Sequence, residues 1–184
     1  MQQPAANLGY AMYEYRDAQH DELDSLKSFL VDHGTNPWNY LPQQGIDRTF
    51  EMITKNQAEA LIVRHQRSPI GLAIFFYADY FPINLIPYVQ PANALYIAEV
   101  VVHGQYAGQG IGSTLLAQII NRGRSLGARK IIIDRHEENK ASAAMMHKVG
   151  FKEVCTFADL ERRDYGSQNT TILEIELSNT TQSG

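Results

Sequence analysis

Three glycines at alternate positions, Gly108, Gly110 and Gly112, stand in the sequence Gln-Tyr-Ala-Gly-Gln-Gly-Ile-Gly-Ser of residues 105–113. This segment follows an apolar run at residues 94–102 and opens an amphipathic run that begins near Ile111. Glycines between a strand and a helix leave backbone N–H groups uncovered by side chains, and the helix dipole adds positive charge there. Such groups favour a phosphate or pyrophosphate, so we expect a phosphorylated cofactor.

Two carboxylates near this segment could take a proton from an amine. An alkylamine with a lysine-like pKa of about 10.4 is mostly protonated near neutral pH and must lose a proton before it attacks a carbonyl. Glu99 lies within an apolar strand, where an unpaired carboxylate is costly, so it is the first candidate as base or amine anchor. A structural partner or an exposed strand position is the alternative. Asp134, at the end of the next apolar run, is the second candidate, and a capping or turn role is its alternative.

Other reactive side chains have contexts that favour structural roles. His103 ends the strand before the glycines and could shuttle protons, or it could be a satisfied strand-end histidine. Cys155, the single cysteine, could carry an acetyl group if a partner stabilised its thiolate, but a buried strand cysteine is favoured. The six histidines show no metal-ligand spacing, so no metal is predicted.

Large aromatic side chains gather in two segments that we expect to border an acceptor site. They are Trp38, Tyr40, Tyr80, Phe81 and Tyr88. These side chains could wall an apolar or aromatic pocket, and plain packing or a dimer contact explains them equally well.

The elements that must position these residues follow from hydrophobic periodicity. Strands are predicted at residues 10–16, 58–65, 70–80, 94–103, 130–135, 151–160 and 170–177. Helices are predicted at residues 17–33, 46–55, 108–127 and 139–149. Residues 81–93 contain three prolines and several apolar side chains, so we expect a loop that lies against the body. Because the glycine segment and its helix form a crossover, the strands at 94–103 and 130–135 should be parallel neighbours.

Composition favours one mixed α/β domain. The chain has 184 residues, of which 44% are hydrophobic and 20% charged, as in ordinary soluble proteins. Residues 8–177 are predicted to form the domain, between loose tails at residues 1–7 and 178–184. No signal-like start, membrane-length apolar run or cysteine pair is found, so we expect a cytoplasmic protein with no membrane partner.

Net charge argues against nucleic-acid binding. The formal value of −4 lacks the cationic footprint that nonspecific binding needs. A local basic cluster exists, and a solvated helix face with its C-terminal end is the simpler interpretation of its members, Arg122, Arg124, Arg129 and Lys130.

With the glycine segment placed between strand and helix, residues 94–154 resemble the GNAT superfamily of acetyl-CoA-dependent N-acetyltransferases. The central pattern of that family is Gln or Arg, two residues, Gly, one residue, then Gly or Ala, and it is matched by Gln105, Gly108 and Gly110. A second element is an Asn, a small residue three positions on, and Gly-Phe eleven and twelve positions on. It is matched by Asn139, Ser142, Gly150 and Phe151. Two spaced motifs in the right order make the resemblance specific.

The resemblance implies a single domain with a mixed, mostly antiparallel sheet of about seven strands, in which a parallel pair splays apart to admit acetyl-CoA. The backbone groups that would face the pantetheine arm belong to Val100, Val101 and Val102. The pyrophosphate would lie on Gly108, Gln109, Gly110, Ile111, Gly112 and Ser113. Asn139 would hydrogen-bond the cofactor arm, with Ser142 beside it. An arm of amides can pair with a strand edge, and a pyrophosphate with a helix N-terminus.

Two positions depart from the family pattern. Ala107 stands where a basic residue is common, so phosphate binding should depend more on backbone N–H groups. Met146 stands where many members carry a tyrosine that protonates the leaving thiolate, and a thioether has no proton to give. His147 is adjacent but points about 100° away around the helix. A loop tyrosine, His147 and solvent stay open as the acid.

These observations predict a metal-free N-acetyltransferase that moves an acetyl group directly from acetyl-CoA to a primary amine, with Glu99 or Asp134 as the base. A small-molecule acceptor is favoured because residues 81–93 would narrow access, and a protein lysine or N-terminus is the alternative. A non-catalytic acyl-CoA-binding module is a rival. A dinucleotide oxidoreductase is a weaker one, because its fingerprint needs glycine where Ser113 stands. A homodimer is left open.

Overall fold

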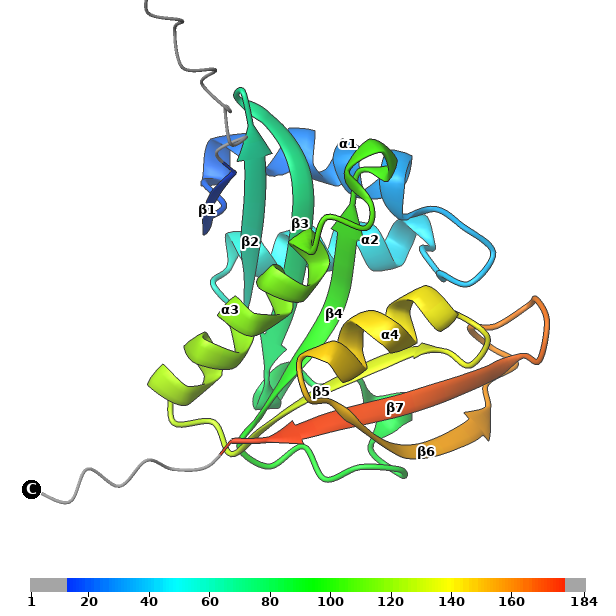
Figure 1. Cartoon of the computed structure of the whole chain (residues 1–184). Helices are drawn as coiled ribbons and strands as arrows, with labels where there is room; N and C mark the ends of the chain where they lie inside the picture. Colours follow the sequence, from blue (N-terminus) through cyan, green and yellow to red (C-terminus); the bar gives the residue numbers. More distant parts are fainter. Residues whose placement is uncertain (1–12, 178–184) are drawn as a thin grey trace, which may run out of the picture.

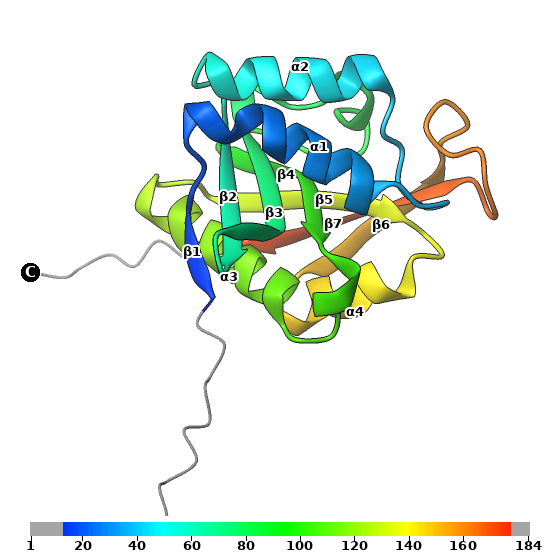
Figure 2. The same ribbon diagram turned by 90° about the horizontal axis from the view of Figure 1, so that it is seen from above.

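A computed structural model describes residues 13–177, which form one seven-stranded sheet with helices on both faces (Figures 1 and 2). The strands are β1 (Glu14–Asp17), β2 (Ala58–His65), β3 (Ser68–Tyr77), β4 (Ala94–Val102), β5 (Lys130–His136), β6 (Lys152–Ala158) and β7 (Asn169–Glu176). The α-helices are α1 (Leu23–Gly34), α2 (Gln43–Thr54), α3 (Ile111–Ser125) and α4 (Lys140–Lys148). Single-turn 3-10 helices are η1 (His20–Glu22), η2 (Ala78–Tyr80), η3 (Ile83–Leu85) and η4 (Gly104–Tyr106). The predicted tails lie outside the described residues.

The strand order across the sheet is β1-β2-β3-β4-β5-β7-β6. Every neighbouring pair is antiparallel except β4 and β5, which run parallel on either side of the α3 crossover. This arrangement confirms the predicted mixed sheet and its single parallel pair. Figure 1 shows β5, β7 and β6 turning away from the direction of β2, β3 and β4.

Each face of the sheet has its own hydrophobic core. Helices α1 and α2 bury Leu26, Leu30, Phe50 and Ile53 against one face, and α3 with α4 buries Leu115, Leu116, Ile119 and Met146 against the other. Figure 2 shows the sheet between these two helix pairs. The three- and four-residue spacing of the apolar side chains therefore predicted the buried sides of these helices correctly.

Most predicted elements are present, and the differences fall at their ends. β2 has the predicted bounds, but β3 ends at Tyr77 because residues 78–80 form η2. β3 also begins at Ser68, since only Gln66 and Arg67 form the turn, with φ of 50° and 73°. The first helix begins later than predicted, with η1 before α1. Residues 81–93 lie against the body as predicted, with Leu85 and Val89 buried.

The parallel pairing of β4 and β5 is short. Its register runs from Ala94 opposite Lys130 to Ile97 opposite Ile133 and ends there. Beyond this point β4 continues to Val102 and β5 to His136 without further pairs between them. The two strands therefore diverge over their C-terminal halves and leave a wedge between them.

Candidate active site

A cavity of about 910 Å³ lies at this wedge. It is walled by the diverging ends of β4 and β5, the start of α3, one side of α4, and the connections around residues 35–42 and 159–168. It brings together every site residue predicted from sequence except Gln109. Those that line it are Glu99, Val100, Val101, Val102, Gly108, Gly110, Ile111, Gly112, Ser113, Asp134, Asn139 and Ser142.

A bulge in β4 sets the direction of Glu99. The register with β3 pairs Ile97 with Phe75 and Glu99 with Ile74, so Ala98 is an extra residue. Ile97 packs in the core under α3 and α4, whereas Val101 packs in the core under α1 and α2. Strict alternation would place both of these residues, and Glu99 with them, on one face. The extra residue shifts the alternation by one and turns Glu99 toward the α1 and α2 side.

The end of β4 presents one paired edge and one open edge. Val100, Val101 and Val102 pair with Ala73, Leu72 and Gly71 of β3. On the other side, the register with β5 has already ended at Ile97. Backbone N–H and C=O groups on that open edge need partners, because an unpaired buried backbone group is costly.

The glycine segment shapes the start of α3. Gly108 and Gly110 have φ of 76° and 81°, a conformation that side chains with a Cβ rarely adopt, and no protein atom lies within 4 Å of where a Cβ would stand. Gly110 is the N-cap and offers no side chain, so the first N–H groups of α3 have no side-chain acceptor. Gln109 does not reach the cavity, because its side-chain oxygen accepts a hydrogen bond from the Tyr13 hydroxyl.

The start of α4 faces the same space. Asn139 is the N-cap of this helix, and its Oδ1 accepts a hydrogen bond from Ser142 N at 3.0 Å. Since the oxygen is engaged in capping, the amide nitrogen is the part of Asn139 left for a ligand. Lys148, the last residue of the same helix, is exposed and also lines the cavity. Lys148 was not predicted from the sequence as a site residue. It lies seven residues after Ala141, and this spacing places the two residues on one side of the helix.

Glu99 has a strongly shifted pKa. Burial, which is the largest cause, and the nearby charge of Asp134 together raise the pKa of this carboxyl from 4.5 to about 8. The side chain of Asn39 and the charges of Arg163 and Arg162 act against this rise. A carboxyl group with a pKa near the working pH is well suited to exchange protons with a substrate.

Asp134 has a different environment, because it belongs to a buried ion network. Its carboxylate accepts hydrogen bonds from the Tyr96 hydroxyl, from Arg163 Nη2 at 2.9 Å and from Arg162 Nη2 at 3.3 Å. Its side chain is only 5% exposed. A carboxylate with three donors is held as a charged partner, so Glu99 is the better candidate for the base.

The two arginines come from the connection between β6 and β7, and neither was predicted from the sequence as a site residue. Asp159 completes their network and accepts from Arg162 Nε at 2.8 Å and from Thr170 Oγ1 at 2.7 Å. Burial alone would raise the pKa of Asp159, but these hydrogen bonds and the arginine charges hold it below its usual value. The adjacent Arg-Arg pair was a signal in the sequence, but periodicity says nothing of its burial.

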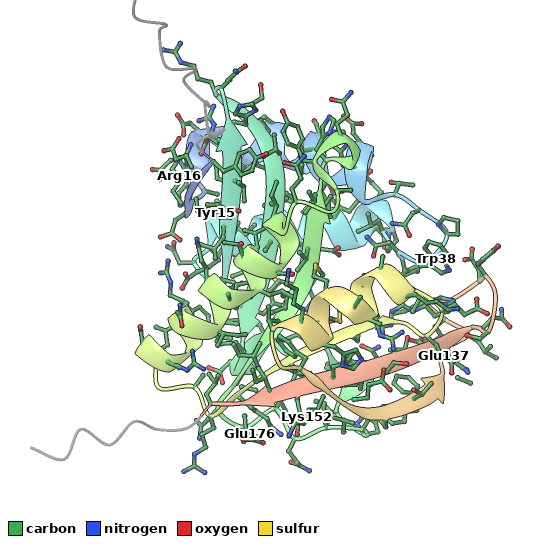
Figure 3. All side chains as sticks on the ribbon, in the orientation of Figure 1. Tyr15, Arg16, Trp38, Glu137, Lys152 and Glu176 are labelled. Atoms are coloured by element: carbon green, nitrogen blue, oxygen red, sulfur yellow. The ribbon has the colours of Figure 1, made fainter. Side chains whose placement is uncertain are left out.

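The predicted aromatic residues separate into two groups. Trp38 and Tyr40 line the cavity, and Figure 3 shows Trp38 at the end of the molecule where the connection from α1 to α2 lies. Tyr80, Phe81 and Tyr88 do not line it. Phe81 packs against Tyr96 with ring centroids 5.3 Å apart, and Tyr88 stacks on Phe157 of β6 at 3.7 Å. From the segment 81–93, Pro82 and Asn84 reach the cavity instead.

The remaining reactive side chains have structural partners. His103 Nδ1 accepts a hydrogen bond from Gln105 N at 3.2 Å and so caps η4. His147 Nδ1 lies 3.2 Å from the carbonyl of Phe151, and His147 does not line the cavity, whereas Met146 does. Cys155 is partly buried, and burial raises the pKa of its thiol, which disfavours a reactive thiolate.

With the fold and the cavity in place, comparison with known proteins defines the class. A family model described as the acetyltransferase (GNAT) family matches residues 10–151. The match spans well over half of the chain, and the chain therefore belongs to the GNAT acetyltransferase family and is an acyltransferase. This confirms the resemblance drawn from the two sequence motifs. No curated protein matches the sequence.

Solved structures agree on the fold at low sequence identity. An N-acetyltransferase from Staphylococcus aureus Mu50 has a TM-score of 0.71 at 20% identity, covering 91% of this chain and 99% of its own. The yncA protein of Salmonella typhimurium, solved with its cofactor acetyl-CoA, has a TM-score of 0.71 at 18% identity, covering 92% and 96%. The ribosomal-protein-S18-alanine N-acetyltransferase of Escherichia coli has a TM-score of 0.68 at 14% identity, covering 94% and 98%.

The structure describes residues 13–177. Within this range, no group of three or more His, Cys, Asp or Glu side chains is placed to hold a metal ion. None of the helices described in this range is long and apolar enough to cross a membrane.

Proposed function

We propose that this acyltransferase moves the acetyl group of acetyl-CoA to a primary amine of a small molecule, by direct attack in a ternary complex. One observation carries the proposal. Glu99, the open edge of β4 and the uncapped start of α3 line one cavity, although they point into it from different elements. We call the side formed by residues 100–102, 108–113, Asn139 and Ser142 the donor half. The acceptor half is the side formed by Glu99, Asp134, Trp38, Asn39 and the two buried arginines.

In the donor half, the pyrophosphate of the cofactor would bind the free N–H groups at the start of α3. The pantetheine amides would pair with the open edge of β4, and Asn139 would donate from its amide nitrogen. The thioester carbonyl would then lie within the wedge, where a backbone N–H of residues 100–102 meets the oxyanion that develops during attack. Lys148 would supply the positive charge that Ala107 lacks.

In the acceptor half, Glu99 would accept a proton from the ammonium group and leave a neutral amine. The amine nitrogen attacks the thioester carbonyl, the C–N bond forms, and the C–S bond breaks to release the thiolate of CoA. The nitrogen loses its second proton to water as the amide forms, and the departing thiolate takes up one proton to become the CoA thiol. Met146 cannot provide that proton and His147 lies outside the cavity, so water or one of the loop tyrosines that line the cavity, Tyr40 or Tyr106, would provide it. A thiol with an ordinary pKa of about 8.5 is an adequate leaving group near pH 8.

A small acceptor is supported by the cover over this half of the cavity. Pro82 and Asn84 of the segment 81–93 and Trp38 and Tyr40 of the α1–α2 connection all line the cavity. A protein N-terminus or lysine is the alternative acceptor, and an acyl-CoA-binding module without turnover is the alternative function, which Met146 favours.

Release of CoA thiol, measured with a panel of small amines and with peptides ending in alanine or carrying lysine, tests the proposal. We expect turnover with small amines and an acidic limb near pH 8 in the pH profile of kcat/KM. We also expect a large loss of kcat/KM in Glu99→Gln. Calorimetry with CoA should give the same affinity for both proteins. Binding of CoA without thiol release by the wild type would favour the module, and turnover with peptides alone would favour a protein acceptor.

A further inference from the structure

The connection between α1 and α2, residues 35–42, forms one wall of the acceptor half. It is held internally by an isolated bridge between Asn36 and Asn39 and by hydrogen bonds from both side-chain amides to the carbonyl of Gly34, each at 3.0 Å. These bonds hold the connection to the end of α1 but do not join it to the sheet or to the β6–β7 connection. Figures 1 and 2 both show it at the same end of the molecule as the connection from β6 to β7.

Arg163 joins these two connections. Its Nη1 donates to the carbonyl of Trp38 at 3.0 Å, across 125 positions of sequence. Its Nη2 donates to Asp134 of β5 at 2.9 Å, and its Nε to Thr170 of β7 at 2.9 Å. The side chain is only 6% exposed, so one buried guanidinium links three elements, with each nitrogen on a different one.

The residue next to Trp38 carries this link to the candidate base. Asn39 lines the cavity together with Glu99, and its side chain lowers the pKa of that carboxyl. The charged and polar groups that act on Glu99 thus come from three directions: Asp134 of β5, Arg162 and Arg163 from the β6–β7 connection, and Asn39 from the α1–α2 connection. Arg163 has a bond to the connection and a charge near the base.

We propose that Arg163 is a positioning residue for the acceptor, because its guanidinium holds residues 35–42 against β5 and keeps Trp38, Asn39 and Glu99 in one arrangement around the amine. The inference rests on the proposed function. It assigns to a residue outside the catalytic step both the shape of the acceptor half and part of the electrostatic environment of its base. The neighbouring Arg162 shares Asp134 but has no bond to residues 35–42, so it is a matched control.

Three variants separate the two effects. Arg163→Lys keeps the charge, but a single ammonium cannot reach acceptors on three elements, so KM for the amine should rise about tenfold while the acidic limb stays in place. Arg163→Met should raise KM and also move the limb to higher pH by roughly half a unit or more, because the positive charge that favours ionised Glu99 is gone. Arg162→Met should move the limb in the same direction and leave the exchange of residues 35–42 unchanged. KM for acetyl-CoA should stay as in the wild type throughout.

Hydrogen exchange provides a readout that does not need turnover. Backbone amides of residues 35–42 should exchange faster in Arg163→Lys and Arg163→Met than in the wild type or in Arg162→Met. The positioning role would be overturned if these amides exchanged at the wild-type rate in Arg163→Lys. It would also be overturned if Arg162→Met accelerated their exchange as much as the Arg163 variants do. If the wild-type protein released no CoA thiol, the proposed function would be wrong. Hydrogen exchange of residues 35–42 would still show whether Arg163 holds the connection. If Arg163→Met fails to fold, the lysine variant decides.

Discussion

The donor and acceptor halves of the cavity are built in opposite ways. The donor half uses backbone groups from two short segments of sequence, residues 100–113 and residues 139–142, and its few side chains need little support. The acceptor half uses charged side chains from β4, β5 and the β6–β7 connection and uncharged side chains from the α1–α2 connection, which Arg163 joins to one another. The donor half therefore depends mainly on short segments of the chain. The acceptor half forms only when segments that are distant in sequence come together in the fold.

This difference has an energetic cause. Backbone N–H groups at a helix start and at a strand edge are produced by the secondary structure itself. A buried carboxylate needs charged partners whose desolvation is costly, so those partners must be placed accurately by the tertiary structure. Changes in the acceptor half should therefore affect proton transfer and pH dependence, and changes in the donor half should affect cofactor affinity.

The largest expected effect comes from the candidate base. Glu99→Gln keeps the shape and the hydrogen-bonding capacity of the side chain but cannot accept the proton, so kcat/KM should fall by about 10²–10⁴-fold. The affinity for CoA should not change. Asp134→Asn is the informative partner variant, because it breaks the ion network rather than the proton transfer. If Asp134→Asn lost activity to this extent while Glu99→Gln stayed active, Asp134 rather than Glu99 would be the base.

The donor half is tested most strongly at Gly110. Gly110→Val places a β-branched residue at φ of 81°, a conformation that costs such a residue about 1–3 kcal/mol. The loop should move to relieve the strain, and the dissociation constant for CoA should rise by roughly 10–100-fold. Gly104→Ala is the matched control, since Gly104 has no positive φ and no neighbour within 4 Å of an added Cβ. Calorimetry measures both, and equal affinities would remove the loop from cofactor binding.

Stability should depend on pH through Glu99. Its carboxyl has a pKa of about 8 in the folded chain against the usual 4.5. The folded chain therefore binds the proton more tightly, and this stabilising contribution is complete below pH 4.5 and is lost as the pH rises through 8. Glu99→Gln lacks this loss and should be more stable than the wild type at pH 9 by roughly 1–3 kcal/mol. Denaturant unfolding should show the two proteins converging near pH 5, and a constant difference would contradict the assignment.

The smallest expected effect concerns the charge next to the glycine segment. Lys148→Gln removes an exposed ammonium that lines the same cavity as the glycine segment, so CoA should bind about 3–10-fold more weakly at low salt. The difference should shrink as salt is added, because an exposed charge is screened. Lys152→Gln, at an exposed position of β6 outside the cavity, should have no effect. Equal losses in the two variants would indicate a general charge effect rather than a phosphate contact.

Several features could be predicted from the sequence for physical reasons. Apolar spacing defines the buried side of each helix, and the crossover through α3 can join β4 and β5 only as parallel neighbours. The glycines at 108 and 110 adopt the conformation that glycine alone tolerates well, so their position before a helix predicted an uncovered N-terminus. The aromatic residues were predicted less well, because Tyr88 and Phe81 pack on side chains that are distant in sequence.

What the sequence determined by itself is the fold class, the order of the elements and the residues of the donor half, because apolar periodicity and short motifs mark them locally along the chain. Only the tertiary structure decided the acceptor half. The extra residue at Ala98 turns Glu99 to the other face of the sheet, and no local pattern marks that shift. The pairing of Arg163 with Asp134 and with the Trp38 carbonyl likewise joins segments far apart in sequence, because a buried charge takes its partner from whatever the fold places beside it.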